Sequence, residues 1–320
     1  MTGRLKHLRD TFKKGGLSKT SYIRKMHDTH KLLWEYRDFI ADKNISAIKI
    51  SPEEVSLTTQ DGITMICDPL DHRSIPLEIM NFNDYELSEL RMIQALLNPK
   101  SVVIDIGANT GWYSLSLSKH IPKGRIVAFE PLPEIYSLLK RNIELNHCKN
   151  IRALNIGLAE KKGACEFYYN PKVTGATSLR DLNPEAKAKK VTCKVETLDS
   201  MMRRLPSHID LIKIDVEGAE LLVIKGALAL LRATTPVLFL EMLRKWSAKF
   251  SYHPNDIIAL LGSIGYRCYC VKHGRLAKVS AVTDNTQETN FFFLNTKKHA
   301  HLIKKLTRAK THTQVKERHQ

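Results

Sequence analysis

Short apolar runs alternate with amphipathic segments along most of this chain. Between residues 101 and 241, β-branched apolar runs predict strands at 101–106, 125–129, 151–156, 164–169, 191–196, 210–215 and 236–241. Apolar residues at helical spacing predict helices over 110–120, over 133–145 and from the end of the 210–215 strand to residue 231. This alternation indicates an α/β fold, with a mostly parallel sheet, right-handed crossovers and helices on both faces.

The N-terminal part has a different pattern. A helix is predicted near residues 20–42, followed by strands at 47–59 and 63–68. Asp61-Gly62 between these apolar runs is a strong hairpin signal, because glycine accepts a positive φ. Residues 69–83 contain two prolines and are predicted to be irregular.

The remaining elements complete the predicted organisation. A short amphipathic helix is expected at 85–97, a helix at 255–264, and an antiparallel strand pair at 266–271 and 290–295. The chain therefore divides into a helix-and-hairpin extension (1–84), the α/β domain (85–296) and a basic tail (297–320).

The net charge of +17 comes mainly from the two ends. Residues 1–43 hold 11 Lys and Arg against 5 Asp and Glu, and residues 297–320 hold 8 against 1. Such ends either contact an anionic membrane or an acidic polysaccharide, or are solvated termini. No apolar run is long enough to span a bilayer and no secretory signal is evident, so a cytoplasmic enzyme, peripheral to a membrane if its ends bind lipid, is expected. The six cysteines lack Cys-x-x-Cys spacing and are interpreted as buried thiols in a reducing compartment.

The candidate cofactor loop is Asp105-Ile-Gly107-Ala-Asn109-Thr-Gly111, between a strand and a helix. A dinucleotide fingerprint requires glycine where Asn109 and Trp112 stand, which argues against a dehydrogenase. An acid before the loop suits a ligand with a cationic amino-acid end. Glu130 ends the next strand, where a carboxylate accepts ribose hydroxyls. Together these features indicate a nucleoside cofactor, S-adenosylmethionine.

The sequence resembles the FkbM family of methyltransferases in five stretches that occur in the family's order over roughly residues 85–270. They are Val103-Ile-Asp-Ile-Gly-Ala-Asn-Thr-Gly-Trp-Tyr-Ser, Val127-Ala-Phe-Glu-Pro-Leu-Pro-Glu, Leu139-Lys-Arg-Asn-Ile-Glu-Leu-Asn146, Thr197-Leu-Asp199 and Asp210-Leu-Ile-Lys-Ile-Asp-Val-Glu-Gly-Ala-Glu220. The resemblance implies a Rossmann-like class I methyltransferase sheet. It also implies O-methylation of a hydroxyl on a sugar, glycan or secondary metabolite.

The same resemblance assigns roles in cofactor binding. The methionine portion would be held by Asp105, Gly107, Asn109 and Gly111. Glu130 would hold the ribose, and Gly157-Leu158 would border the adenine. Tyr85-Glu86 would close over the cofactor from upstream of the first strand.

A hydroxyl acceptor needs a base, or a metal that lowers its pKa. Asp215 and Glu217 follow the 210–215 strand and share a face if the extended conformation continues, with Lys213 pairing one of them. Glu241 ends the next strand, so Asp215 and Glu241 are candidate oxygen ligands for Mg²⁺. His253 is a candidate general base, and the polar segment 170–190 is a candidate lid or an ordinary loop.

Two other functions remain open. The basic ends suggest an RNA or other nucleic-acid methyltransferase, but acids at the site would repel phosphate and no basic stripe with interleaved aromatics is present. Amino-group methylation of bases usually comes with an Asn/Asp-Pro-Pro-aromatic run, where Asp215-Val-Glu-Gly stands here. A non-catalytic S-adenosylmethionine-binding module would be expected to lose cofactor residues that are intact here.

Overall fold

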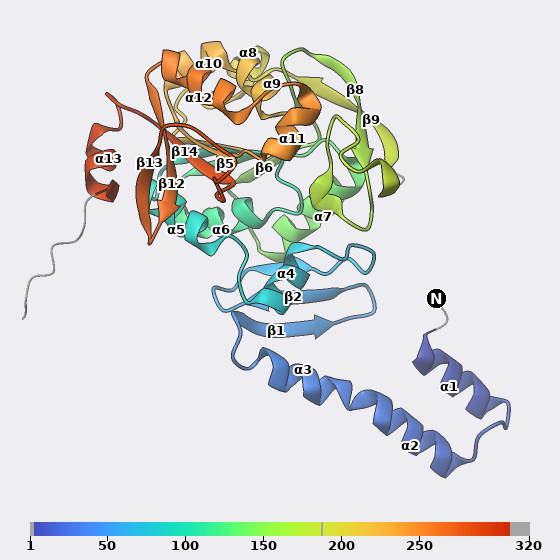
Figure 1. Cartoon of the computed structure of the whole chain (residues 1–320). Helices are drawn as coiled ribbons and strands as arrows, with labels where there is room; N and C mark the ends of the chain where they lie inside the picture. Colours follow the sequence, from blue (N-terminus) through green and yellow to red (C-terminus); the bar gives the residue numbers. More distant parts are fainter. Residues whose placement is uncertain (1–2, 187, 308–320) are drawn as a thin grey trace, which may run out of the picture.

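An eight-stranded sheet forms the centre of the protein in this computed structural model, which describes residues 3–186 and 188–307 (Figure 1). Its strands follow the order β13-β12-β14-β11-β10-β4-β5-β6. Their bounds are β4 Val102–Ile106, β5 Arg125–Phe129, β6 Ile151–Leu154, β10 Leu211–Ile214, β11 Val237–Glu241, β12 Tyr266–Lys272, β13 Arg275–Val279 and β14 Asn290–Asn295. The five strands from β6 to β11 are parallel, and β14, β12 and β13 continue the sheet as antiparallel strands. The predicted α/β class and its C-terminal antiparallel pair are confirmed. β13, which lies between the two predicted strands in sequence, was missed.

Alternate side chains of the parallel strands enter two apolar cores, one on each face of the sheet. Ile104 and Ile106 join one core, whereas Val103 and Leu211 join the other. Helices cover both faces, which is why these strands consist of nearly continuous apolar residues. The helices of this part are α5 Leu87–Leu96, α6 Trp112–His120, α7 Pro133–Leu145, α8 Leu198–Met201, α9 Glu220–Lys225, α10 Leu228–Thr234, α11 Arg244–Ser247 and α12 Pro254–Ser263. The single helix predicted up to residue 231 is therefore two helices, α9 and α10.

A second, small sheet joins the N-terminal extension to the main body. It consists of β1 Ile45–Ile50, β2 Val55–Thr59 and β3 Thr64–Ile66, all antiparallel. The long strand predicted at 47–59 is two strands, because Ser51 Oγ accepts hydrogen bonds from the amides of Glu53 and Glu54 and closes a turn. The predicted hairpin between β2 and β3 is confirmed.

The segment predicted to be irregular contains a helix, α4 Ile75–Phe82. The prediction was wrong because Pro76 lies in the first turn, where its missing N–H costs no helical hydrogen bond. A third sheet, of order β7-β9-β8, flanks the main one and is formed by β7 Gly157–Leu158, β8 Gly163–Tyr169 and β9 Lys189–Glu196.

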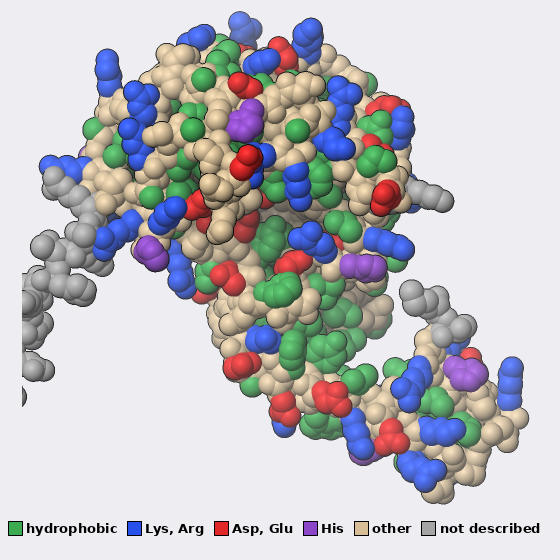
Figure 2. All heavy atoms as spheres, viewed as in Figure 1, with side chains coloured by type: hydrophobic (Ala, Val, Ile, Leu, Met, Phe, Trp, Pro, Cys, Tyr) green, Lys and Arg blue, Asp and Glu red, His purple; other side chains and the backbone are tan. Residues whose placement is uncertain are grey.

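Three helices extend from the body at the N-terminus: α1 Arg4–Lys13, α2 Lys19–His30 and α3 Leu32–Ile40 (Figure 1). None of them contains a buried residue. Figure 2 shows Lys and Arg side chains spread over the far end of this arm. Among the described residues, no helix combines the length and the apolar character that crossing a bilayer requires. The predicted basic tail begins with α13 Ala300–Thr307, and its remainder, 308–320, lies outside the described residues.

Asn142 of α7 joins the extension to the loop after β4. Its side chain is fully buried, accepts a hydrogen bond from the Ile66 amide (3.0 Å) and donates one to the Thr110 carbonyl (2.8 Å). We expect Asn142→Ala to destabilise the fold by about 2–4 kcal/mol, because both backbone groups lose their partner in a buried place. Urea denaturation measures the change. The exposed Glu144→Ala on the same helix is the control, with an expected effect within about 0.5 kcal/mol. Equal unfolding midpoints for Asn142→Ala and wild type would contradict this role.

Candidate functional site

A cavity of about 280 Å³ opens at the carboxyl ends of the parallel strands. Its floor is formed by residues at or just after the carboxyl ends of β4, β5, β10 and β11, four adjacent strands of the sheet. Ligands of open α/β sheets bind at this edge, where helices cross to opposite faces. The roof comes from two segments outside the central sheet, residues 73–75 and 173–177.

Gly107 is the residue of the β4–α6 loop where a side chain is excluded. Its φ is 72°, and a Cβ there would lie 1.8 Å from the Asp215 carbonyl oxygen. The loop is held against β5 because the amides of Gly107 and Ala108 both donate to the Phe129 carbonyl at 3.0 Å. Gly107 and Asn109, the predicted cofactor-binding residues of this loop, both line the cavity. Backbone thus approaches any bound ligand closely at this point.

Asp105 and Gly111 do not line the cavity, so their predicted contact with a cofactor needs correction. Asp105 lies within β4 and pairs in register with Lys213 of β10, which directs its carboxylate to the inside of the protein. There it accepts a hydrogen bond from Ser114 Oγ (2.6 Å) and lies 3.4 Å from Lys213 Nζ. Gly111 precedes α6 and packs under the loop, where an added Cβ would lie 2.6 Å from Leu139.

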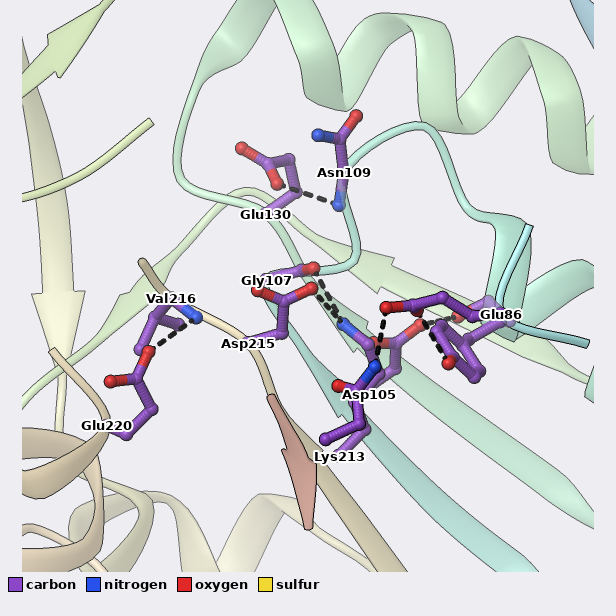
Figure 3. A network of polar contacts seen from close by, with 12 residues as sticks. Glu86, Asp105, Gly107, Asn109, Glu130, Lys213, Asp215, Val216 and Glu220 are labelled. Carbon is purple, nitrogen blue, oxygen red and sulfur yellow. Dashed lines mark hydrogen bonds and ion pairs between the residues drawn. The ribbon is translucent and has the colours of Figure 1, made fainter. Parts of the chain in front are cut away.

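Glu130 lines the cavity directly after β5 (Figure 3). Its Oε2 accepts a hydrogen bond from the Asn109 amide and its Oε1 one from the Leu132 amide, both at 3.0 Å. Burial raises the pKa of this carboxyl to about 7, against the effect of the two amides. The two hydrogen bonds fix the carboxylate and leave lone pairs on both oxygens for hydroxyl donors.

The predicted adenine border lies to one side of this cavity. Gly157 and Leu158 line a small adjoining cavity of about 20 Å³. A Cβ on Gly157 would lie 2.9 Å from the Phe167 ring, which explains the glycine as a packing requirement. The apolar wall beside Glu130 is formed instead by Pro131, Ile135 and Phe167. Sequence reasoning missed this wall, although Pro131 directly follows Glu130.

Tyr85 lines the cavity and packs edge-on against Trp112, with ring centroids 6.3 Å apart. Glu86, predicted together with it, is not part of the lining and lies behind Tyr113. It accepts hydrogen bonds from the Tyr113 hydroxyl (2.8 Å) and from Asn290 Nδ2 (2.7 Å). Burial, followed by the charge of Asp215, raises the pKa of Glu86. Glu86 therefore ties the segment before α5 to β14.

Three carboxylates meet on the other side of the Gly107 loop. Asp215, Glu217 and Glu241 line the cavity, and one oxygen atom of each lies within 4.8 Å of those of the others. The expected extended conformation does not continue to Glu217, because β10 ends at Ile214 and Glu217 has a φ of 49°. The turn nevertheless carries its side chain to the other two. Burial, and secondly the charge of Asp215, raise the pKa values of Glu217 and Glu241.

Lys213 is the buried cation beneath this cluster (Figure 3). Its Nζ lies 3.2 Å from Asp215 Oδ2 and 3.2 Å from the Gly107 carbonyl oxygen. Burial alone would lower the pKa of Lys213, but Asp215 and Asp105 raise it above its usual value. The predicted pairing of Lys213 with a neighbouring acid is confirmed.

Glu220 shapes the turn of residues 215–218 after β10, here called the acidic turn, but is not part of the cavity lining. It accepts hydrogen bonds from the amides of Val216 (3.3 Å) and Gly218 (2.9 Å) and from the Tyr252 hydroxyl (2.9 Å). Burial raises its pKa to about 7. Glu220 lies in one of the stretches that resemble the FkbM family, but the sequence assigned it no role. Its partners are backbone amides of the turn and a tyrosine far away in sequence, which no sequence pattern indicates.

His253 is placed outside the cavity, so its prediction as a general base needs correction. It is exposed, precedes α12 and accepts a hydrogen bond from the Asn255 amide, while Asp256 accepts one from the His253 amide. This reciprocal pair is a helix N-terminal capping box.

Part of the candidate lid does border the cavity. Residues 173–177 line it, and Thr174 is anchored to the buried Asp71 by its hydroxyl (2.5 Å). Ser178 Oγ donates a hydrogen bond to the Glu217 carbonyl (2.7 Å). The roof is thereby connected both to the N-terminal extension and to the acidic turn. Residue 187 of the candidate segment lies outside the described residues.

Comparison with known proteins identifies relatives of this chain. It is 33% identical over 153 residues to methyltransferase sdnD of Sordaria araneosa, covering 39% of this chain and 59% of that protein. It is 27% identical over 161 residues to the 31-O-demethyl-FK506 methyltransferase FkbM of Streptomyces tacrolimicus, covering 41% and 60%. The chain thus spans about three fifths of the length of these two curated relatives. A solved structure, methyltransferase FkbM from Methylobacillus flagellatus KT, matches with a TM-score of 0.42 and 17% identity, covering 68% of this chain and 53% of that one.

The model of one protein family, the methyltransferase FkbM domain, matches residues 105–268. This match extends from β4, through the cofactor loop and the acidic turn, into β12. Because it covers just over half of the chain, the protein belongs to the FkbM methyltransferase family.

Proposed function

We propose that this chain is an S-adenosylmethionine-dependent O-methyltransferase that acts on a hydroxyl of a small metabolite or glycan. The observation that carries the proposal is the division of one cavity into two chemically different sides. Glu130 and an apolar wall lie on one side of the Gly107 loop, and three carboxylates lie on the other. Family membership supports methyl transfer as the reaction.

Glu130 would bind the ribose of the cofactor through lone pairs that its two amide hydrogen bonds leave free. The adenine of the cofactor would contact Pro131, Ile135 and Phe167, and its amino-acid portion would lie against the backbone at Gly107. When bound, S-adenosylmethionine supplies a methyl group that a nucleophilic oxygen displaces from sulfur. Alignment of the two reactants in one cavity contributes most of the acceleration expected for such a displacement.

The carboxylate side would activate the acceptor. A hydroxyl becomes an effective nucleophile when a base takes its proton or when a cation such as Mg²⁺ lowers its pKa, and carboxylates can serve in either role. The lining of the cavity also includes Trp246, Thr174 and Thr177, an aromatic and two polar residues of the kind that suit the carbon face and oxygens of a sugar or a polyol metabolite. One relative carries a name that defines its acceptor by a demethylated oxygen, which also favours O-methylation.

A nucleic-acid acceptor is the weaker alternative. The three carboxylates lie at the acceptor side of the cavity, where they would repel phosphate groups. The Lys and Arg excess is found in residues 1–43 and 297–320, away from the sequence that lines the cavity.

We also propose that the N-terminal arm contacts an anionic lipid surface. Leu32, Leu33, Tyr36 and Phe39 are each 44–54% exposed and fall on one face of α3 at helical spacing. Residues 3–30 carry eight Lys and Arg against two Asp and Glu. Basic residues beside an exposed apolar helix face are typical of interfacial membrane helices. An acidic polysaccharide would offer the positive charge a partner but the apolar face none.

The cofactor assignment predicts that Glu130→Gln weakens S-adenosylmethionine binding at least about tenfold, or about 1.4 kcal/mol, because the amide cannot accept both ribose hydroxyls. Isothermal titration calorimetry at pH 8 measures this. Glu160→Gln, in an exposed loop, is the matched control and should bind like wild type. Unchanged affinity in Glu130→Gln would remove Glu130 from the cofactor site, and no binding by wild type would refute the proposed function.

The raised pKa of Glu130 predicts a pH dependence. Below about pH 7 the carboxyl is increasingly protonated and loses acceptor capacity, so cofactor affinity should fall as the pH drops from 8 to 6. Glu130→Gln should lack this component, while any titration of the cofactor itself is common to both proteins. Parallel pH profiles for the two proteins would show that Glu130 does not titrate at the site.

The arm is tested by sedimentation with vesicles of phosphatidylcholine containing phosphatidylserine. The double variant Leu33→Gln, Phe39→Gln should bind at least about tenfold more weakly than wild type, because two large apolar side chains lose their burial in lipid. Leu70→Gln, an exposed leucine on the body, should bind normally. Equal binding by the double variant would contradict lipid contact, as would binding to heparin without binding to vesicles.

A further inference from the structure

The three carboxylates of the cavity come from two neighbouring strand ends. Asp215 is the first residue after β10, Glu217 follows in the turn, and Glu241 is the last residue of β11. One oxygen of each lies within 4.8 Å of the others, and all three residues face the same cavity. Clusters of carboxylates are common on protein surfaces, so the balance of charge around this cluster decides whether it is a candidate cation site.

The available positive charge does not balance the cluster. Lys213 is shared between Asp105 and Asp215, at 3.4 and 3.2 Å. Among the described residues, no Lys, Arg or His forms an ion pair with the carboxylate of Glu217 or Glu241, and the side chain of Glu241 shares a hydrogen bond with Asp215. Lys213 and Lys245, whose charge lowers the pKa of Glu217, therefore supply two positive charges against the five negative charges that Asp105, Asp215, Glu217, Glu241 and Glu86 would carry if ionised.

A buried oxygen supplies a second and independent observation. Glu217 Oε2 exposes less than 1 Å² to solvent and has no hydrogen-bond partner among the described residues. A carboxylate oxygen without a partner in such a place is unfavourable unless a ligand reaches it or a proton neutralises the group. The turn that carries it is itself fixed, because Glu220 binds the amides of Val216 and Gly218. The oxygen is thus held in place without a protein group to bind.

We propose that Asp215, Glu217 and Glu241 bind one divalent cation that prefers oxygen ligands, with Mg²⁺ as its representative. Opposite ligands of one ion lie about 4.2 Å apart for Mg²⁺ and up to about 5 Å apart for Ca²⁺. The three ligand oxygens lie within 4.8 Å of one another, so small side-chain adjustments would bring them to a single ion. The ligand set contains no cysteine or histidine, which disfavours soft metals.

This site deepens the proposed function and rests on it, because it defines the class of acceptor. Three protein ligands leave about three of six positions for water and acceptor oxygens. An acceptor with two adjacent oxygens, such as a vicinal diol or a 2-hydroxy acid, would chelate the ion and present one hydroxyl to the methyl group. The hydroxyl proton passes to solvent, the oxygen electron pair forms the bond to the methyl carbon, and the carbon–sulfur bond breaks to leave S-adenosylhomocysteine.

The experiment uses the full chain treated with EDTA and titrated with Mn²⁺, a paramagnetic substitute for Mg²⁺, without cofactor or acceptor. Electron paramagnetic resonance of free Mn²⁺ should show one bound ion per chain, displaced by Mg²⁺. Glu217→Gln and Glu241→Gln should each weaken binding at least about tenfold, since each removes one charged ligand. Glu78→Gln, another carboxylate of the cavity lining that lies outside the cluster, is the matched control and should bind like wild type.

Thermal denaturation of each variant establishes that it is folded, and Glu241→Asp, which keeps a carboxylate, should retain most of the affinity. Absence of Mn²⁺ binding in wild type, or equal binding in both Gln variants, would overturn the site. Displacement of Mn²⁺ by S-adenosylmethionine would also overturn it, because the cluster would then serve the charge of the cofactor. Calorimetry with S-adenosylmethionine on the same samples separates the claims: cofactor binding without Mn²⁺ binding refutes only the metal site, whereas absent cofactor binding refutes the proposed function.

Discussion

The buried contact of Lys213 with Asp105, Asp215 and the Gly107 carbonyl is the constraint on which the site depends. It joins the carboxyl ends of β4 and β10, two adjacent parallel strands, at the point where both chains leave the sheet. An ammonium in this place must be paired, since burial without partners would cost several kcal/mol. Removing any one partner would therefore disturb the cofactor loop and the acidic turn together. The backbone of Gly107 also packs closely against the Asp215 carbonyl, which fixes the separation of the loop after β4 from the turn after β10.

Two buried glutamates hold the backbone on either side of this contact. Glu130 accepts one hydrogen bond from the loop after β4, from the Asn109 amide, and one from the Leu132 amide, whereas Glu220 accepts two from amides of the turn after β10. Both are carboxyls whose burial raises the pKa to about 7. The difference is that Glu130 reaches the cavity and Glu220 does not. One residue is thus available to a ligand, while the other keeps the carboxylates of the turn in position.

The sequence predicted the central sheet well, because periodic apolar runs directly report burial on two faces. It also found the strand ends where Glu130, Asp215 and Glu241 emerge, since parallel strands bring their carboxyl ends together. The predictions were wrong for side chains whose direction or hydrogen-bond partner depends on the tertiary structure. Asp105 was assigned to a ligand but pairs with Lys213 across β4 and β10, and His253 was assigned to catalysis but caps α12. The wall formed by Phe167 comes from a distant sheet, which no local sequence pattern indicates, whereas the roof at Thr174 falls within segment 170–190, the candidate lid.

We propose that one cavity brings a methyl donor to the oxygen of a small acceptor. The most direct measurement incubates the full chain with S-adenosylmethionine labelled in its methyl group and with fractionated cell extract, and follows where the label goes. We expect label in a low-molecular-weight or glycan fraction, in a bond that resists mild alkali and with one S-adenosylhomocysteine formed per methyl group. Label that is released by nuclease, or no transfer to any fraction by a chain that binds the cofactor, would contradict it.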